Sequence, residues 1–342
     1  MGRLGPGRDM TGRELVDRFG RVHRDLRISL TDRCNLRCTY CMPAEGVPWI
    51  PRPELLTTDE IIRLASVFAS LGIVEVRLTG GEPLLLPDLA DVVHRLSAIE
   101  GADGPLRVSI TTNGIGLDTR ARELADAGLE RFNISLDTLR ADRFATLTRR
   151  DRLDDVLRGI AAAQATGLTP LKINTVAMHG VNDDELTDLV RFAREHGAQL
   201  RFIEQMPLDA GHTWSRAQMV TGDDILAALS AEFALSACDD RGSNPAQLYT
   251  VDGGPTTVGV IASVTAPFCG SCDRVRLTAD GQLRNCLFAR GESDLRALLR
   301  SGAPDERIES AIRESVTAKL AGHGIDDPGF LQPDRPMSAI GG

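Results

Sequence analysis

The sequence predicts an α/β protein in which a parallel sheet is covered by helices on its outer side. Two observations support this fold class. Short β-branched runs alternate with helical patterns of 10 to 16 residues, and this unit occurs six times in succession. The regular spacing favours a partial barrel over a doubly wound sheet. Active sites of α/β barrels lie at the carboxyl ends of the strands, so we expect ordinary packing inside the barrel and functional polar residues just after each strand.

The six expected strands are short runs rich in branched apolar residues. They cover Leu26–Leu30, Ile73–Thr79, Leu106–Thr112, Arg131–Leu136, Leu171–Ala177 and Gln199–Gln205. Amphipathic helical patterns lie at 58–72, 117–129 and 183–197, the first with a Thr/Asp cap and the last two ending at or near Gly. The polar groups that follow the strands should converge on one rim, beside the cysteine loop described below. They are 79–83, 111–114, 135–137, 174–176 and 204–206.

Length, charge and cysteine content narrow the possible functions. The 342 residues suit one barrel with extensions, and 39 basic against 48 acidic residues give a net charge of −9, so nothing indicates a nucleic acid as partner. The first 27 residues lack an apolar signal region and no run of about 18 apolar residues occurs, so we expect a cytoplasmic protein without a membrane partner. Six of the seven cysteines form two tight clusters and Cys238 stands alone, which favours cytosolic metal binding over disulfides.

The first cluster comprises Cys34, Cys38 and Cys41, spaced C-x3-C-x2-C. Three thiolates within eight residues can hold one face of an iron–sulfur cluster. A [4Fe-4S] cluster usually takes four cysteine ligands, so a loop with three leaves one iron open for a small chelating molecule. A structural zinc loop is the alternative, but zinc needs a fourth ligand and no His or further Cys lies close in sequence.

With Tyr40 directly before its last cysteine, this loop resembles the signature of the radical S-adenosylmethionine (SAM) enzymes. In that superfamily the open iron chelates SAM, and an electron from the cluster cleaves it to methionine and a 5′-deoxyadenosyl radical. The sequence Gly80-Gly81-Glu82-Pro83, which follows a predicted strand, resembles the segment whose backbone meets the methionine amino group. Taken alone, it could be only a tight strand-to-helix turn.

The second cluster comprises Cys269, Cys272 and Cys286. A zinc ribbon would need Cys238 or a His as a fourth ligand, whereas beside the first triad an auxiliary iron–sulfur cluster is favoured. The triad frames Arg274 and Arg276, which lie on the same side of an extended segment. Their guanidinium groups suit phosphate and planar heterocycles.

The two triads, the Arg-Val-Arg sequence and the C-terminal Ser-Ala-Ile-Gly-Gly together resemble the GTP 3′,8-cyclase family, the molybdenum cofactor biosynthesis protein A family, from about Arg27 to Gly342. The resemblance implies an N-terminal extension (1–24), an incomplete (β/α)6 barrel of the TIM type (25–240), and a C-terminal domain (241–342) that holds the second cluster and closes the barrel mouth. It implies GTP as substrate and abstraction of the C3′ hydrogen, followed by bonding of C3′ to C8 to give 3′,8-cyclo-7,8-dihydro-GTP. It also implies a reducing electron donor and a downstream cyclic pyranopterin monophosphate synthase, and it is compatible with a homodimer.

The resemblance further implies roles for individual residues, each at a matching position of this chain. Two [4Fe-4S] clusters would be held by Cys34, Cys38 and Cys41 and by Cys269, Cys272 and Cys286. SAM would be bound by Tyr40, Gly81, Ser135 and Met206. GTP would be bound by Arg27, Arg77, Thr111, Lys172, Arg201, Arg274 and Arg276. Catalysis would also need Arg274, Arg276 and the terminal Gly341 and Gly342, which would enter the site and arrange its arginines.

Each of these residues has a structural alternative. Met206 could be core packing, Lys172 and Arg201 could form ion pairs at a barrel mouth, Arg27 could be a surface charge, and the two glycines could be a frayed end. One position departs from the family. Glu75 stands where members commonly carry a Lys that meets the triphosphate, and strand alternation puts it on the same face as Arg77.

Three other functional classes share some of these features. A peptide-modifying radical SAM enzyme would also have a cysteine-rich C-terminal region, but the terminal glycines and the arginine pair argue against it. An RNA-modifying enzyme is disfavoured by the acidic net charge and the 4% aromatic content. An iron–sulfur sensor would have no need of the Gly-Gly-Glu-Pro turn or a barrel rim.

Overall fold

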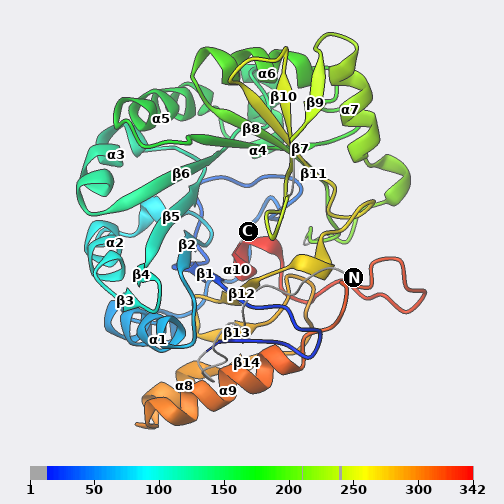
Figure 1. Cartoon of the computed structure of the whole chain (residues 1–342). Helices are drawn as coiled ribbons and strands as arrows, with labels where there is room; N and C mark the ends of the chain where they lie inside the picture. Colours follow the sequence, from blue (N-terminus) through cyan, green and yellow to red (C-terminus); the bar gives the residue numbers. More distant parts are fainter. Residues whose placement is uncertain (1–13, 210, 239–240, 342) are drawn as a thin grey trace, which may run out of the picture.

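The computed structural model describes residues 14–209, 211–238 and 241–341. One sheet of twelve strands organises them, in the order β14-β13-β12-β1-β2-β5-β6-β7-β8-β11-β10-β9. In Figure 1 the strands follow one another in an arc, with α1, α2, α3, α5, α6 and α7 along its outside and α10, next to the C-terminus, on its inner side. Among the described residues, no helix combines the length and apolar character needed to cross a membrane.

All six predicted strands are present and lie side by side in parallel. They are β1 (Asp25–Ser29), β2 (Glu75–Thr79), β5 (Arg107–Thr112), β6 (Leu129–Ser135), β7 (Lys172–Ala177) and β8 (Gln199–Glu204). Their bounds differ by at most two residues from those expected, so the mixed α/β fold with a largely parallel sheet is confirmed.

Strands from the C-terminal part of the chain extend both edges of this sheet. β12 (Arg274–Leu277) pairs in parallel with β1, and β11 (Thr257–Ile261) pairs in parallel with β8. Antiparallel strands finish the two edges, namely β13 (Gln282–Arg284), β14 (Ser293–Asp294), β10 (Gln247–Val251) and β9 (Leu235–Ala237). A separate ribbon joins β3 (Glu100–Gly101) to β4 (Gly104–Pro105). The segment around the second cysteine triad is therefore built directly onto β1.

Ten α-helices are present in the described residues, and most of them cover the apolar face of the sheet. They are α1 (Thr58–Ser70), α2 (Leu89–Ser97), α3 (Leu117–Asp126), α4 (Ala141–Thr148), α5 (Leu153–Ala165), α6 (Leu186–Glu195), α7 (Gly222–Ser230), α8 (Leu295–Arg300), α9 (Asp305–Thr317) and α10 (Met337–Ile340). The cap of α1 lies one residue earlier than expected, at Thr57, whose hydroxyl accepts from the Glu60 amide while the Glu60 carboxylate accepts from the Thr57 amide. The pattern at 183–197 begins a helix later than expected, at Leu186. Asn182 and Glu185 explain this, because both side chains turn inward to bind other segments.

The inner face of the strands corrects one expectation. Apolar side chains such as Leu26, Ile28, Val76 and Leu78 are fully or almost fully buried and join the main apolar core. The alternating positions do not carry ordinary packing residues but charged ones, including Arg27 and Arg77. The inner face of the curved sheet is therefore polar. Strand register determines which of its charged side chains lie next to one another.

Candidate active site

The first cysteine loop is held in shape by its own backbone and by its neighbours. The Cys41 amide donates to the Cys38 carbonyl over 2.9 Å. The Cys34 sulfur accepts from the Leu36 amide at 3.4 Å and from the Asn113 side-chain amide at 3.9 Å. Asn113 follows β5, so one of the predicted strand-end groups does meet the cysteine loop.

The three thiols of this loop lie close enough to influence one another. Burial and the nearby Cys34 raise the pKa of Cys41 to about 12. Burial, followed by Cys41 and Asp137, raises the pKa of Cys38 well above its usual range. Three buried sulfurs this close can all be thiolates only beside a strong positive charge, which an iron–sulfur cluster supplies.

The two glycines after β2 pack directly against the start of this loop. The Gly81 amide donates to the Thr31 carbonyl over 2.6 Å, and the Glu82 amide donates to the Arg33 carbonyl over 2.7 Å. A Cβ at Gly80, whose φ is +143°, or at Gly81 would overlap backbone oxygens of residues 31–33. The Glu82 carboxylate accepts from Leu84, Thr112 and Asn113. The Gly-Gly pair therefore fixes the cysteine loop against β2, while Glu82 ties β2 to the end of β5.

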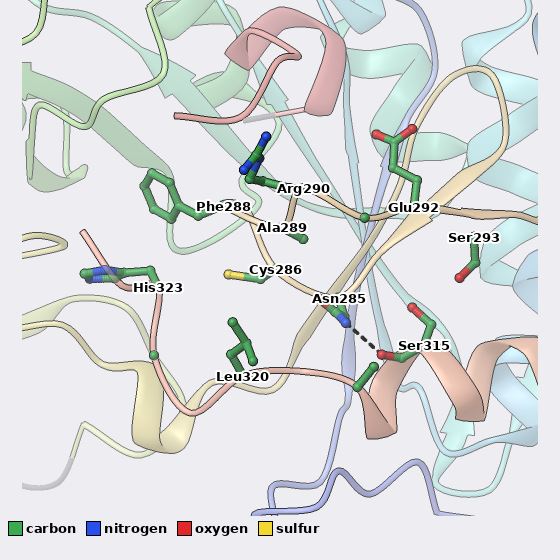
Figure 2. A pocket seen from close by; sticks show the side chains of 13 residues that line it. Asn285, Cys286, Phe288, Ala289, Arg290, Glu292, Ser293, Ser315, Leu320 and His323 are labelled. Carbon is green, nitrogen blue, oxygen red and sulfur yellow. Dashed lines mark hydrogen bonds between the residues drawn. The ribbon is translucent and has the colours of Figure 1, made fainter. Parts of the chain in front are cut away.

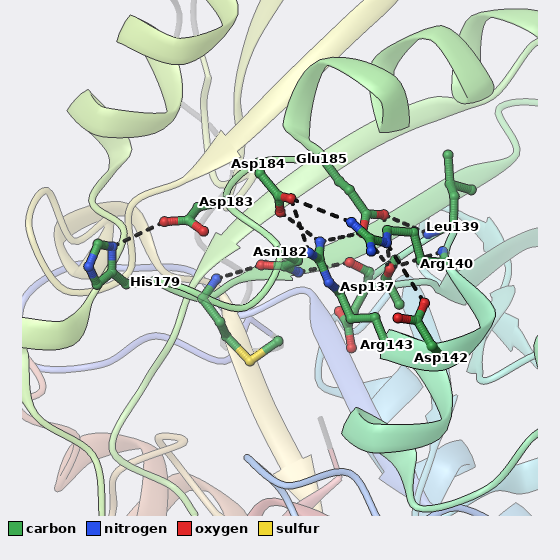
Figure 3. Close-up of polar contacts among 12 residues, drawn as sticks. Asp137, Leu139, Arg140, Asp142, Arg143, His179, Asn182, Asp183, Asp184 and Glu185 are labelled. Carbon is green, nitrogen blue, oxygen red and sulfur yellow. Dashed lines mark hydrogen bonds and ion pairs between the residues drawn. The ribbon is translucent and has the colours of Figure 1, made fainter.

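Tyr40 is anchored by Asp137, which belongs to the polar network that follows β6. Its hydroxyl donates to Asp137 over 2.7 Å, and the second oxygen of Asp137 accepts from the Val176 amide over 2.9 Å. Burial raises the pKa of Asp137 to about 6. Figure 3 shows the residues that hold the Asp137 segment in place. The Asn182 side chain donates to the Asp137 carbonyl, and the Glu185 carboxylate accepts from the Leu139 amide and from Arg143. The loops after β6 and β7 thus meet the cysteine loop at Tyr40.

Three further residues expected to contact SAM or GTP lie at or near the ends of strands. Ser135 ends β6 opposite Asn174 of β7, and Thr111 lies on β5 opposite Asn133. Met206 follows β8 and packs against a small apolar cluster of Met219, Val264 and Ile325. Glu204, also in an expected strand-end group, instead accepts from the amides of Gly222, Val264 and Thr265. It fixes the start of α7 and the loop toward the second triad.

Strand register brings the basic residues together. Arg276 of β12, Arg27 of β1, Arg77 of β2, Ser109 of β5 and Arg131 of β6 are successive partners across five neighbouring strands. Partners in adjacent parallel strands point to the same side, so this row faces one interior. Lys172 and Arg201 continue it on β7 and β8, opposite Asn133 and Asn174.

The electrostatics confirm that these cations share one space. Burial and the neighbouring Arg201 and Arg131 lower the pKa of Lys172 to about 6. Burial and Arg77 lower the pKa of Arg201 to about 9, and they lower that of Arg27 well below its usual range. The site therefore holds more positive than negative charge, and its cations repel one another. An anionic ligand would relieve that repulsion.

Glu75 faces this interior on the same side as Arg77, as its alternation predicts. It forms ion pairs with Arg131 and, at 3.4 Å, with Arg77. Burial opposes ionisation, but Arg131 and Arg77 together hold the pKa of Glu75 below its usual value. Arg131 was not among the expected site residues. The signal for it was in the sequence, because Arg131 is four residues before Ser135 on the same strand face.

The second triad is assembled by β12, β13 and the turn before them. Cys269 begins a short helical turn (Cys269–Ser271), Cys272 directly follows that turn, and Cys286 follows β13. Burial would raise the pKa of Cys272, but Arg274 and Lys319 lower it below its usual value. A cavity of about 370 Å³ lies beside Cys286, and Figure 2 shows Phe288, Leu320 and His323 around that sulfur.

The C-terminal tail runs between the two cysteine triads. Ser338 of α10 lies beside the Cys41 thiol. Arg276 donates to the Gly341 carbonyl over 2.6 Å. The Arg276 charge also interacts electrostatically with Cys286 and Cys272. Gly341 has φ +82°, and a Cβ there would overlap the Thr79 hydroxyl. Gly342 lies outside the described residues.

Neither triad forms a ready-made site for a single metal ion. In the described ranges, no three His, Cys, Asp or Glu side chains are close enough to hold one ion. Thiolates on one zinc ion, with Zn–S near 2.3 Å, would be about 3.8 Å apart. Three cysteines on a four-iron cluster each bind a different iron and lie farther apart. The seven cysteines form no disulfide.

Comparison with known proteins agrees with this geometry. The radical SAM superfamily profile matches residues 28–193, and the profile Molybdenum Cofactor Synthesis C matches residues 198–325. A GTP 3′,8-cyclase of Streptomyces coelicolor is 61% identical over 331 residues, covering 96% of both chains. GTP 3′,8-cyclase 2 of Mycobacterium tuberculosis is 55% identical over 338 residues, covering 96% of this chain and 92% of its own. Among solved structures, Streptococcus suis SuiB bound to S-adenosylmethionine matches with a TM-score of 0.58 at 14% identity, over 85% of this chain and 69% of its own. That likeness concerns the fold alone.

Proposed function

The chain belongs to the GTP 3′,8-cyclase family of radical SAM enzymes, which act in molybdenum cofactor synthesis, and we propose from this membership that one interior site binds SAM and GTP between two iron–sulfur clusters. The C-terminal tail is the observation that carries the proposal. It touches the first cysteine loop through Ser338 and the second triad's arginine segment through Gly341. A substrate that lies along this tail would be within reach of both clusters.

In this proposal Cys34, Cys38 and Cys41 would hold a [4Fe-4S] cluster, and SAM would bind the iron that lacks a cysteine ligand. When bound, the cluster and SAM supply the 5′-deoxyadenosyl radical that removes the C3′ hydrogen of GTP, after which C3′ bonds to C8. Tyr40, Gly81, Ser135 and Met206 surround SAM. Tyr40 is held in place by Asp137, and the close packing of Gly81 on residues 31–33 keeps the cysteine loop at the end of β2.

The triphosphate of GTP binds the cationic row inside the sheet, at Arg27, Arg77, Lys172 and Arg201, with Thr111 beside it. Charge-assisted contacts of this kind are each worth roughly 1.5 to 3 kcal/mol, because they replace repulsion among buried cations as well as adding attraction. Arg274 and Arg276 lie nearer the second triad, where the guanine base would meet the open iron of a second [4Fe-4S] cluster. The Gly341 carbonyl accepts from the Arg276 guanidinium and so restrains it.

The same proposal covers the domain organisation and partners. The arc from β1 to β8 would be the incomplete (β/α)6 barrel of residues 25–240, and residues 241–342 would close its mouth. A low-potential electron donor and a cyclic pyranopterin monophosphate synthase that accepts the product would complete the pathway.

Anaerobic incubation with SAM and a reductant tests the proposal. We expect about eight irons per reconstituted chain, since each triad suits a four-iron cluster. We expect cyclised GTP product with GTP, and none with ATP at the same concentration. A reconstituted chain that contains one zinc and only about four irons would refute the proposal of a second iron–sulfur cluster. 5′-Deoxyadenosine without cyclised product would overturn the placement of GTP.

A further inference from the structure

Lys319 is a buried cation for which the reaction scheme above has no role. The chain contains 39 basic residues, and Lys172 and Lys319 are its only lysines. Lys172 lies in the proposed triphosphate site. Lys319 follows α9 and is 2% exposed. All other Lys/Arg positions are arginine. Both lysine ammonium groups lie in the interior.

The partners of Lys319 belong to the second triad. Its ammonium donates to the Cys272 sulfur at 3.5 Å and to the Arg274 carbonyl at 2.8 Å. In the described part of the chain it forms no ion pair with a carboxylate. Burying an ammonium without a counter-charge is costly, and the negative charge that can balance Lys319 is that of Cys272 and Cys286.

The segment that contains Lys319 contacts the triad at a second point. The His323 amide donates to Cys269, so two of the three cysteines accept from residues 319–323. Arg21 holds this segment in place by donating to the carbonyls of Cys269 and Leu320, both at 2.7 Å. Arg21 is in turn bound by the buried Asp17. The N-terminal residues 15–23, which the family resemblance left without a role, therefore clamp the segment against the triad.

We propose that Lys319 is a positioning residue of the second iron–sulfur site, whose ammonium hydrogen-bonds the Cys272 ligand and sets the reduction potential of the cluster. The proposal rests on the two-cluster function above. Hydrogen bonds to cluster sulfurs and nearby charge are among the factors that set such potentials. A positive charge stabilises the more negative, reduced cluster, so Lys319 raises the potential.

A redox titration followed by electron paramagnetic resonance (EPR) tests this inference. The full-length chain with Cys34, Cys38 and Cys41 all changed to Ala leaves only the second cluster to observe. In that background, Lys319→Met should keep about four irons but lower the ratio of reduced to oxidised cluster at least tenfold at a fixed potential, which is about 59 mV for one electron. Lys319→Arg should recover most of the shift. Arg21→Lys is the matched control, because it loosens the same segment but keeps the positive charge beside Cys269, and its retained cluster should stay within threefold of the parent ratio.

The other outcomes also decide. A Lys319→Met ratio within threefold of the parent, with iron unchanged, would overturn the inference. If Lys319→Met loses its iron, recovery by Lys319→Arg would support a need for charge, and failure of Lys319→Arg would show that Lys319 only fills space. Absence of any four-iron cluster in the parent background would instead refute the second cluster itself. Because the chain has two lysines, labelling with ¹⁵N-lysine adds a direct readout. Pulsed EPR should show nitrogen coupling to the second cluster that survives Lys172→Arg and disappears in Lys319→Met.

Discussion

Arg276 and Gly341 are joined by a hydrogen bond of 2.6 Å from a guanidinium nitrogen to a backbone carbonyl, and both residues are buried. The bond ties β12, and with it the second triad, to a tail that also touches the first cysteine loop at Ser338. The position of the tail is thus coupled to both triads, although it contributes no cysteine.

Gly341→Ala should strongly reduce cyclised GTP. The added Cβ would overlap the Thr79 hydroxyl, and φ of +82° disfavours any side chain, so the tail should shift and release Arg276. Iron content should be unchanged, and 5′-deoxyadenosine should fall less than the cyclised product. Gly302→Ala is the control, because Gly302 also has a positive φ but open space around its Cβ. Full product formation by Gly341→Ala would mean that the tail is only a terminal extension.

Lys172→Ala should weaken GTP binding about tenfold or more while SAM affinity stays nearly unchanged. Equal loss of both ligands would mean that Lys172 supports the sheet.

Binding of GTP should also charge Lys172. The pKa of Lys172 is lowered to about 6 in the ligand-free site, so the amine is mostly neutral at pH 7.5. A bound triphosphate would raise that pKa, and the amine would then take up a proton. Calorimetry in buffers of different ionisation enthalpy should show more proton uptake for the parent chain than for Lys172→Ala, and GTP affinity should fall as the pH rises from 7 to 9. Identical proton uptake by the two chains would contradict a phosphate contact at Lys172.

Glu75→Gln should tighten GTP binding about tenfold, because it removes a negative charge from a site for an anion. The change should also lower stability without ligand, since Arg131 and Arg77 lose their counter-charge. The pKa of Glu75 is lowered in the folded chain, so its contribution to stability is present above the carboxyl's ordinary pKa of about 4.5 and is lost as the pH falls further. Thermal melts with and without GTP measure both effects. Weaker GTP binding by the variant would show that Glu75 acts mainly by orienting Arg131.

Glu185→Ala should destabilise the chain by roughly 2 to 4 kcal/mol, because it leaves the buried Thr138 hydroxyl and Leu139 amide without their acceptor. SAM binding should weaken as well, since this network supports the Asp137 that anchors Tyr40. Asp183→Asn is the control. Asp183 is adjacent to the network but pairs with the exposed His179, so this change should alter stability by less than about 0.5 kcal/mol. Chemical denaturation of the parent and both variants measures these differences.

The local patterns of the sequence were enough to find the six central strands and both cysteine triads. Alternation within each strand also put Glu75 beside Arg77 correctly. What the sequence could not provide was the pairing between distant strands. Arg276 and Arg27 are 249 residues apart, and only the register of β12 on β1 makes them neighbours. For the same reason Lys319 and the N-terminal clamp were missed, since each contacts partners far along the chain.

The charged inner face was also beyond the pattern of single strands. Alternating polar residues in a strand usually face water, and here they face an interior because the sheet curves around them (Figure 1). The fine structure of the site therefore depends on curvature and register, while its chemistry can be read from the motifs.

GTP carrying deuterium at C3′ gives the most direct test of the central claim, that this interior holds GTP with its ribose next to SAM. After anaerobic turnover, mass spectrometry of the 5′-deoxyadenosine should find deuterium in it, and the cyclised product should lack deuterium at C3′. If the 5′-deoxyadenosine carries no deuterium while cyclised product forms, the hydrogen is taken from elsewhere, and the placement of GTP in this site is wrong.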